Sequence, residues 1–293
     1  KVCKPGSGWN VIHIDGLATP NFTGEVVPLA VSRVLLSPTW VEERKTRWGE
    51  NSPLYIAKVR GLFPEDAEDT VVPLSWANRC RNRPTDHPTP DGRLPVGAGG
   101  DLAVIQERRG MTAGRTWRTN TRDPEELVRW AVAIIDDTRP TTVKIDEIGI
   151  GWGTMGGRRT ELARDGHHPA TITGINVGRS ALDTTLFPKL RDQMWWQVGR
   201  ELSEPVDCTC GADPRHGTWD LTAIDDDTVA QLTAPKYTID ASGRVKVEPK
   251  EETRKRIGRS PDDADALLLA YMTIPPEVDE VVEYHDGVEV SPY

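Results

Sequence analysis

Short stretches of alternating or β-branched residues, each bounded by a turn, predict β-strands along the chain. Two closely spaced pairs of such stretches predict hairpins, and two single stretches predict strands that alternate with helices. The hairpins are expected at 102–109 with 115–119 and at 236–239 with 244–248, and the single strands at 142–146 and 170–177. Residues 9–15 also alternate in the manner of a strand.

Capping residues mark where helices begin. Asp123 and Pro124 supply an N-cap and a first helical residue, and two glutamates follow in the first turn. Ser37 and Pro38 give the same signal nearer the N-terminus. Apolar periodicity predicts further helices at 156–164 and 187–202, and a last helix after residue 260.

The order of these elements predicts an α/β fold with a mixed sheet and helices packed on it. A hairpin comes first, strands and helices then alternate, and a second hairpin precedes the last helix, which is typical of such a sheet. A length of 293 residues suits one large or two smaller domains. Residues 84–100 are rich in Pro, Gly and Asp, which indicates a linker or loop.

The last predicted helix carries acids on its first turn. Ser260 is a natural N-cap and Pro261 fits the first helical position. Asp262 and Asp265 are three residues apart and therefore share a face, whereas Asp263 leaves it. Carboxylates held in this way are candidate metal ligands, although capping alone also explains acids at a helix start.

A second candidate acid, Asp146, ends the strand predicted at 142–146. Glycines follow at 149, 151 and 153, which indicates a loop. In open α/β sheets, ligands bind beyond the carboxyl ends of strands, so Asp146 is placed to face a site. Glu147 would point to the opposite side of the strand. The alternative is a turn aspartate that caps the next helix.

Composition narrows the possible partners. The net charge of -9 argues against a general nucleic-acid binder, unless many of the acids gather at a metal site. No apolar stretch approaches the ~20 residues that span a bilayer, so we expect no membrane partner. Four cysteines are too few for a disulfide framework. Basic residues do gather before the acidic helix, at Lys246, Lys250, Arg254, Lys255, Arg256 and Arg259.

Acids at the end of one strand and at the start of a distant helix, beside a mixed sheet, fit a site that cleaves phosphodiesters with two metal ions. Such sites place two divalent ions ~3.5–4 Å apart and hold them with carboxylates. Ligands that are all oxygen favour magnesium or manganese over zinc. We therefore expect Mg²⁺ or Mn²⁺, with two ions bound.

The sequence also resembles the C-terminal portion of bacteriophage terminase large subunits, the motor-nucleases that package DNA into proheads. The resemblance runs from about residue 9 to residue 271 and depends on the order of several motifs. These motifs lie at 19–25, 37–44, 47–50, 55–63, 146–153 and 259–270.

The resemblance implies a domain plan. Residues 1–75 would be the C-terminal end of an ATPase domain, 76–100 a linker, 101–275 a ribonuclease H-like nuclease domain and 276–293 an acidic tail. No phosphate-binding G-x-x-x-x-G-K-[ST] loop occurs, so ATP would bind only in a missing N-terminal part, and this chain alone would not hydrolyse it.

The resemblance also implies site residues. Asp146 matches the acid that ends the central strand, and Asp262 matches the acid that opens the last helix, both as catalytic metal ligands. Asp265 is an additional metal ligand, and Asp101 and Glu147 are supporting or substitute acids. From the basic run, the candidates for DNA binding are Lys250, Arg254, Arg256 and Arg259.

One departure from the family pattern concerns the first strand, which should carry a catalytic aspartate before a glycine-rich turn. Here Val96 runs directly into Gly97 and no acid occupies that place. We therefore expect a strand of ~5–6 residues to be missing. Three explanations compete: residues absent from the sequence, a true deletion that leaves the nuclease inactive, or replacement by Asp101. The first is favoured, because losing a central strand would leave neighbouring backbone groups unpaired.

The predicted function is a metal-dependent endonuclease that cuts concatemeric double-stranded DNA during genome packaging. Its partners would be DNA, the portal protein and the terminase small subunit, with several copies assembled on the prohead. It would act in the host cytoplasm, transiently at the portal vertex. One alternative is a catalytically inactive module that docks and grips DNA in the motor. Another is an enzyme of the same fold that resolves junctions or cuts RNA.

Overall fold

A computed structural model gives the fold of this chain. The structure describes residues 12–48, 50, 53–62, 69–81, 95–99, 103–121, 123–148, 170–203 and 218–273.

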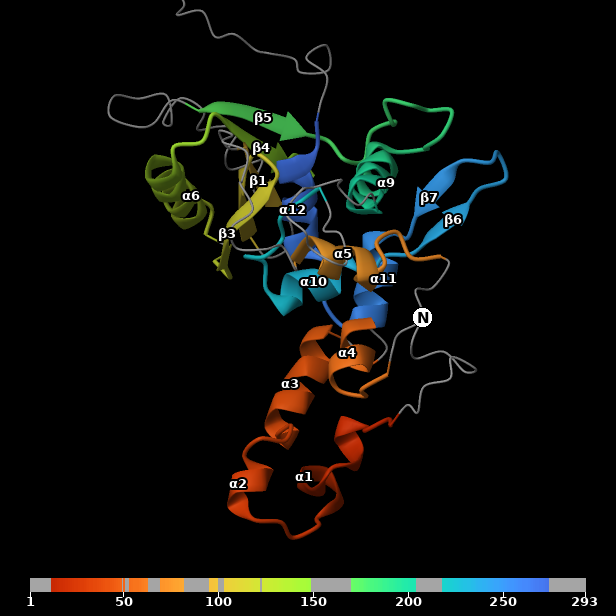
Figure 1. Ribbon diagram of the computed structural model, residues 1–293. Helices are drawn as coiled ribbons and strands as arrows, with labels where there is room; N and C mark the ends of the chain where they lie inside the picture. Colours follow the sequence, from red (N-terminus) through yellow and green to blue (C-terminus); the bar gives the residue numbers. More distant parts are fainter. Residues whose placement is uncertain are drawn as a thin grey trace, which may run out of the picture.

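A mixed five-stranded sheet forms the centre of the molecule (Figure 1). Its strand order is β3-β2-β1-β4-β5. The strand β2 pairs antiparallel with both β1 and β3, whereas β4 runs parallel to β1 and to β5. The strands span Pro95–Gly99 (β1), Ala103–Arg109 (β2), Thr112–Thr119 (β3), Thr142–Asp146 (β4) and Thr171–Ile175 (β5).

A helix covers each face of this sheet. Helix α6 (Pro124–Thr138) packs on one face, where Val143 and Ile145 of β4 are buried with its apolar side. Successive strand residues point to opposite faces, so Lys144 and Asp146 face the other helix, α12 (Asp262–Tyr271). The ammonium of Lys144 donates to the Met272 carbonyl at the end of α12, which confirms this orientation.

The remaining elements of the C-terminal half surround α12. Helix α9 packs beside it, and a separate hairpin, β6 with β7, leads into α11 (Figure 1). They span Leu190–Ser203 (α9), Asp226–Leu232 (α10), Tyr237–Ile239 (β6), Val245–Val247 (β7) and Lys250–Ile257 (α11).

The N-terminal helices extend away from the sheet as a stalk (Figure 1). The far end of the stalk is small and exposes apolar side chains such as Val26 and Val34. The near end joins the main core, because Val41, Tyr55 and Val59 are buried with residues of α9 and α12. The stalk consists of Gly16–Ala18 (η1), Pro20–Thr23 (α1), Leu29–Ser32 (α2), Pro38–Trp48 (α3) and Pro53–Lys58 (α4), whereas Leu74–Arg81 (α5) lies in the main body.

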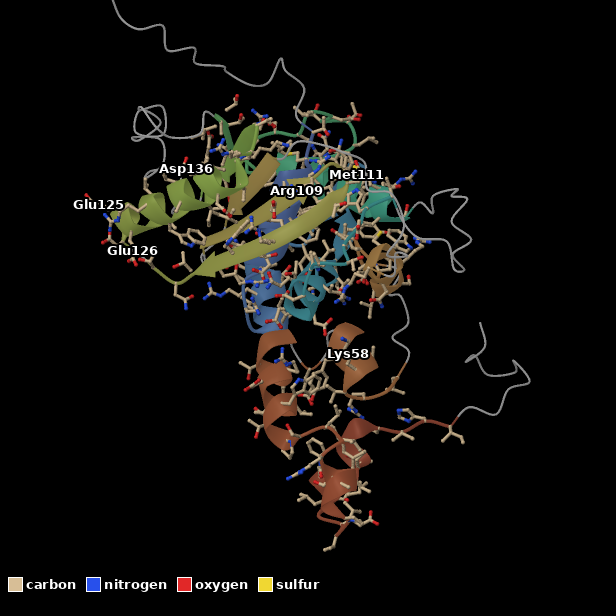
Figure 2. All side chains as sticks on the ribbon, turned by 60° about the vertical axis from the view of Figure 1, so that its left-hand side comes forward. Lys58, Arg109, Met111, Glu125, Glu126 and Asp136 are labelled. Atoms are coloured by element: carbon tan, nitrogen blue, oxygen red, sulfur yellow. The ribbon has the colours of Figure 1, made fainter. Side chains whose placement is uncertain are left out.

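Most predicted elements are confirmed. Both hairpins, both single strands and the helix predicted at 187–202 are present. Asp123 caps α6, and its carboxylate accepts from the Glu125 backbone N–H at 2.8 Å. Figure 2 shows Glu125 and Glu126 at the outer end of α6. The helix predicted at 156–164 lies outside the described residues, and residues 12–15 of the strand predicted at 9–15 are not in a strand.

The linker predicted at 76–100 is wrong at both of its ends, because a helix occupies the first residues and a strand occupies the last ones. Helix α5 crosses the predicted boundary at residue 75, and β1 lies inside the predicted linker. Its composition of Pro, Val, Gly and Ala resembles a loop, but β1 has a strand on both sides to pair its backbone. Pairing across the sheet therefore overrides local propensity here.

The expectation of a missing first strand is also wrong. Val96 and Gly97 are consecutive residues of β1, and they pair with Val143 and Lys144 of β4. The strand is present at the centre of the sheet, but its five residues include no acid. Residues absent from the sequence are therefore not needed to complete the sheet.

Within the described ranges, no helix is long and apolar enough to cross a membrane.

Candidate metal centre

The first turn of α12 is held by side chains from outside the helix. Pro261 occupies the N-cap position and makes no side-chain cap. Instead, the Gln231 Oε1 atom accepts from the Asp263 backbone N–H at 2.8 Å. Ser260 is not the N-cap that the sequence predicted, because the helix begins one residue later than expected. The Ser260 hydroxyl donates to Asp262 Oδ1 at 2.7 Å and orients that carboxylate.

Asp263 is an anchor of the fold and not a ligand. Its side chain is fully buried, and its Oδ1 atom accepts from Arg118 Nε of β3 at 2.8 Å. Its Oδ2 atom accepts from Gln231 Nε2 at 2.5 Å and pairs with Arg259 Nη2 at 3.4 Å. Because these donors occupy its carboxylate, Asp263 has no access to a ligand. This agrees with the expectation that Asp263 lies off the face that Asp262 and Asp265 share.

Asp262 and Asp265 lie on one face, as their spacing predicted, and both bind the ammonium of Lys250. Lys250 Nζ lies 2.8 Å from Asp262 Oδ1 and 3.1 Å from Asp265 Oδ2. Burial alone would lower the pKa of Lys250, but the charges of Asp265 and Asp262 raise it above its ordinary value. The two acids therefore hold a cation between them.

Asp146 faces the same group from the end of β4. Its carboxylate accepts from the Ile148 backbone N–H at 3.0 Å. Burial raises the pKa of Asp146, and the nearby Asp265 raises it further, whereas Lys250 opposes the shift. Glu147 is close enough to add a smaller upward shift to the Asp146 pKa, and its backbone N–H donates to the Ile175 carbonyl. The structure thus brings together Asp146, Asp265, Asp262 and Lys250.

These residues fit a divalent ion in the kind of donor that they offer. The donors are carboxylate oxygens, which suit Mg²⁺ or Mn²⁺. In the described part of the chain, however, no three side chains from His, Cys, Asp and Glu are grouped to hold a metal. Two reasons follow from the geometry: β1 supplies no acid, and Lys250 lies between two of the carboxylates. Asp101 lies outside the described residues.

Several of the basic residues predicted to bind DNA contact acids within the fold. Lys250 binds the site acids, Arg256 pairs with Glu248, and Arg259 pairs with Asp227 at 3.7 Å as well as with Asp263. Arg254 is exposed on α11. The contact of Lys250 with the acids could not be read from the sequence, because Lys250 precedes Asp262 by a whole helix and a turn.

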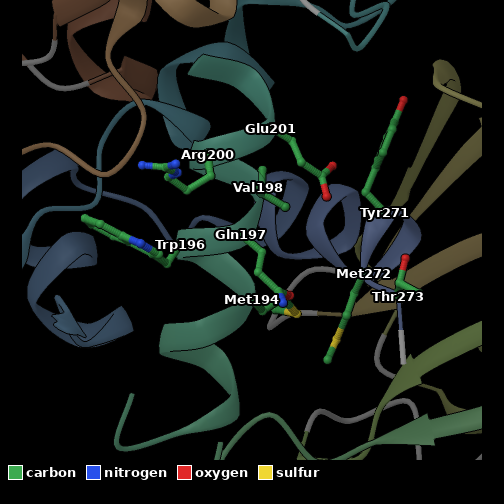
Figure 3. Close-up of a pocket in the computed structure, with 9 residues that line it drawn as sticks. All are labelled: Met194, Trp196, Gln197, Val198, Arg200, Glu201, Tyr271, Met272 and Thr273. Atoms are coloured by element: carbon green, nitrogen blue, oxygen red, sulfur yellow. The ribbon is translucent and has the colours of Figure 1, made fainter. Parts of the chain in front are cut away.

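A separate pocket lies between α9 and the C-terminal end of α12 (Figure 3). Its volume is about 290 Å³, and Trp196, Met194 and Met272 supply much of its lining. Its acid, Glu201, accepts from the Trp219 indole N–H at 2.8 Å. With a single carboxylate already engaged, this pocket offers no metal site, and it lies at the end of α12 opposite to Asp262.

Comparison with known proteins identifies the fold. No protein-family model matches the sequence, and no curated protein matches it. Among solved structures, the nuclease domain of the large terminase subunit gp2 of bacterial virus Sf6 matches with a TM-score of 0.54 and 19% identity. A mutant of that domain with manganese matches with a TM-score of 0.55 and 19% identity. Both alignments cover 70% of this chain and 99% of the other.

At this identity the likeness shows the fold. The resemblance inferred from the sequence is therefore confirmed for the fold. The chain has the ribonuclease H-like fold of the nuclease domain of phage large terminase subunits.

Proposed function

We propose that this chain is the metal-dependent DNA endonuclease part of a phage terminase large subunit. The observation that carries the proposal is the placement of Asp146, at the end of β4, near Asp265 of α12, whose partner Lys250 also binds Asp262. The fold is that of a nuclease domain for which a mutant structure with manganese is known. The substrate would be concatemeric double-stranded DNA, cut during genome packaging.

Asp146, Asp262 and Asp265 do not form a ready-made three-acid group, so the metal would draw them together, and their oxygens favour Mg²⁺ or Mn²⁺. When bound, a divalent ion lowers the pKa of the attacking water and stabilises the negative charge on the leaving oxygen. Ser260 orients Asp262 through its hydroxyl, and Ile148 orients Asp146 through its backbone N–H. The binding of two ions stays a prediction of the resemblance.

The same proposal covers partners and location. Arg254 is the exposed member of the predicted DNA-binding group, and the portal protein and small subunit would be protein partners. Several copies would assemble at the prohead portal vertex, in the host cytoplasm. Residues 1–75 would be the end of an ATPase domain, with ATP bound elsewhere, and 276–293 an acidic tail.

Cleavage of plasmid DNA tests the proposal. We expect the purified chain to cut plasmid DNA with Mg²⁺ or Mn²⁺ and to stop when the metal is chelated. Asp146→Asn and Asp262→Asn should each reduce the cleavage rate by at least about a hundredfold, since each removes a charged ligand. Gel electrophoresis over a time course measures the rate.

Asp137→Asn is the matched control, because Asp137 is an exposed acid on α6, on the far side of the sheet. It should cleave as fast as the unchanged chain. Undiminished cleavage by both site variants would show that the activity lies elsewhere.

A second candidate function is an inactive module that docks and grips DNA in the packaging motor. The absence of any acid in β1 favours it, because the family places a catalytic aspartate in that strand. DNA retained in a gel-shift assay, without metal binding in calorimetry and without cleavage, would support this candidate over the nuclease.

A further inference from the structure

Asp227, in the first turn of α10, bridges two arginines that belong to different parts of the chain. Its Oδ1 atom lies 3.4 Å from Arg44 Nη1 of the stalk helix α3, and its Oδ2 atom lies 3.7 Å from Arg259 Nη1, in the turn before α12. We infer that Asp227 is a positioning residue that ties the turn before Asp262 to the stalk. The inference rests on the proposed function, because it treats Asp262 as a metal ligand.

The turn between α11 and α12 carries the groups that orient the Asp262 carboxylate. The Nη2 atom of Arg259 contacts the buried Asp263 at 3.4 Å, so the guanidinium is held between two carboxylates. The next residue, Ser260, donates to Asp262 Oδ1 at 2.7 Å. A shift of Arg259 therefore moves the hydroxyl that orients Asp262.

Helix α3 also touches this turn directly. A Cβ atom on Gly258 would lie 3.6 Å from the carbonyl oxygen of Thr46 in α3, which is van der Waals contact. Gly258 ends α11 with a φ of 77°, a conformation that glycine adopts easily. Figure 1 shows α3 reaching the sheet domain beside α10 and α11. The stalk thus meets the turn both through the Asp227 bridge and at Gly258.

The bridge is largely shielded from water. The exposed fraction of the side chain is 15% for Asp227, 18% for Arg44 and 25% for Arg259. Water and salt weaken fully exposed ion pairs, whereas they screen partly buried pairs much less. The bridge can therefore hold the turn in place.

The preceding residue, Asp226, has a different task. Its carboxylate pairs with Arg81 of α5 at 2.9 Å and with Lys58 of α4, so it joins α10 to N-terminal helices. Neither of these partners belongs to the turn before α12. Two neighbouring acids, each between two cations, thus differ in whether they reach the metal-binding turn.

Two measurements on the full chain test the inference. Hydrogen exchange without added metal follows the turn, and electron paramagnetic resonance of Mn²⁺ measures metal affinity. Asp227→Asn keeps the shape of the side chain and removes its charge. We expect exchange at residues 258–265 to become about fivefold faster or more. Mn²⁺ should bind about threefold more weakly or worse.

Arg44→Met tests whether the stalk acts through Asp227. It keeps the apolar part of the side chain and should change both measurements in the same direction as Asp227→Asn. Combined with Asp227→Asn it should add nothing, because the bridge is already broken.

Asp226→Asn is the matched control, because Asp226 is adjacent, carries the same charge and also binds two cations. It should leave exchange at residues 258–265 and the Mn²⁺ affinity unchanged. Thermal unfolding followed by circular dichroism checks that each variant is folded at the temperature of the measurements.

Unchanged exchange at residues 258–265 or unchanged Mn²⁺ affinity in Asp227→Asn would overturn the inference. Equal changes in Asp226→Asn, or a full additional effect of Arg44→Met on Asp227→Asn, would do the same. These results leave the proposed nuclease intact, because the unchanged chain still binds Mn²⁺. If the unchanged chain binds no Mn²⁺, the proposed nuclease fails, whereas exchange still decides whether Asp227 positions the turn.

Discussion

Neighbouring acids in the first turn of α12 have different tasks because their surroundings differ. Asp262 and Asp265 face a cation, whereas Asp263 lies in the interior among Arg118, Gln231 and Arg259. A buried carboxylate with such partners is costly to remove, since Arg118 Nε and Gln231 Nε2 then lose the acceptor that they share inside the protein. Asp263 thus holds β3, α10 and α12 together beneath the site.

We predict that Asp263→Ala lowers the free energy of unfolding by about 3–5 kcal/mol, which is the usual cost of breaking a buried ion pair. Urea denaturation followed by circular dichroism measures the change. Asp137→Ala removes an exposed acid, paired with Arg115 at the surface, and should change the free energy by less than ~0.5 kcal/mol. Equal effects from the two variants would show that burial of Asp263 does not matter.

At the scale of elements, α9 approaches the segment before α5 closely at a glycine. A Cβ atom on Gly199 would lie 2.7 Å from the Val71 carbonyl oxygen. That oxygen belongs to the backbone, so it moves only with the segment as a whole. The contact sets the distance between α9 and the residues that join the stalk to the core.

Gly199→Ala should therefore lower the melting temperature, although alanine is normally the better helix residue by about 1 kcal/mol. We expect a net loss of about 1–3 kcal/mol from overpacking. Gln197→Ala, an exposed change in the same helix, should be neutral or slightly stabilising. A higher melting temperature for Gly199→Ala would mean that the segment yields without cost.

At the scale of the whole molecule, three helices of the N-terminal half bind the first turn of α10. Arg81 Nη1 pairs with Asp226 Oδ1 at 2.9 Å, and Lys58 pairs with the other oxygen of that carboxylate. Arg44 pairs with Asp227 at 3.4 Å. Figure 2 shows Lys58 at the junction between the stalk and the sheet domain. These pairs join the two halves next to the apolar core that they share.

Asp226→Asn should weaken this junction. We expect a loss of about 1 kcal/mol near neutral pH, because Asp226 is partly exposed, and faster hydrogen exchange in α4. Burial alone would raise the pKa of Asp226, but Lys58 and Arg81 hold it below its ordinary value.

A carboxylate with a lowered pKa stabilises the fold above its ordinary pKa and loses that effect as the pH falls through the lowered value. The difference between Asp226→Asn and the unchanged chain should therefore shrink in acid, and also at high salt. Glu125→Gln, a change of an exposed acid in α6, is the control and should leave exchange in α4 unchanged.

The sequence by itself determined the elements with strong local signals. The alternation at 102–119 and 236–248, the Asp123 cap and the three-residue spacing of Asp262 and Asp265 all depend on neighbours along the chain, and all are confirmed. The strand that ends in Asp146 was also predicted, because β-branched residues and the following glycines mark it.

Only the tertiary structure decided the rest. Pro95–Gly99 becomes the central strand because β2 and β4 offer backbone partners on both sides, although its own residues resemble a loop. Gln231 takes the capping role expected of Ser260, and Lys250 lies between the site acids, through contacts between residues distant in sequence. Such contacts leave no local pattern, because they depend on how α10, α11 and α12 pack together.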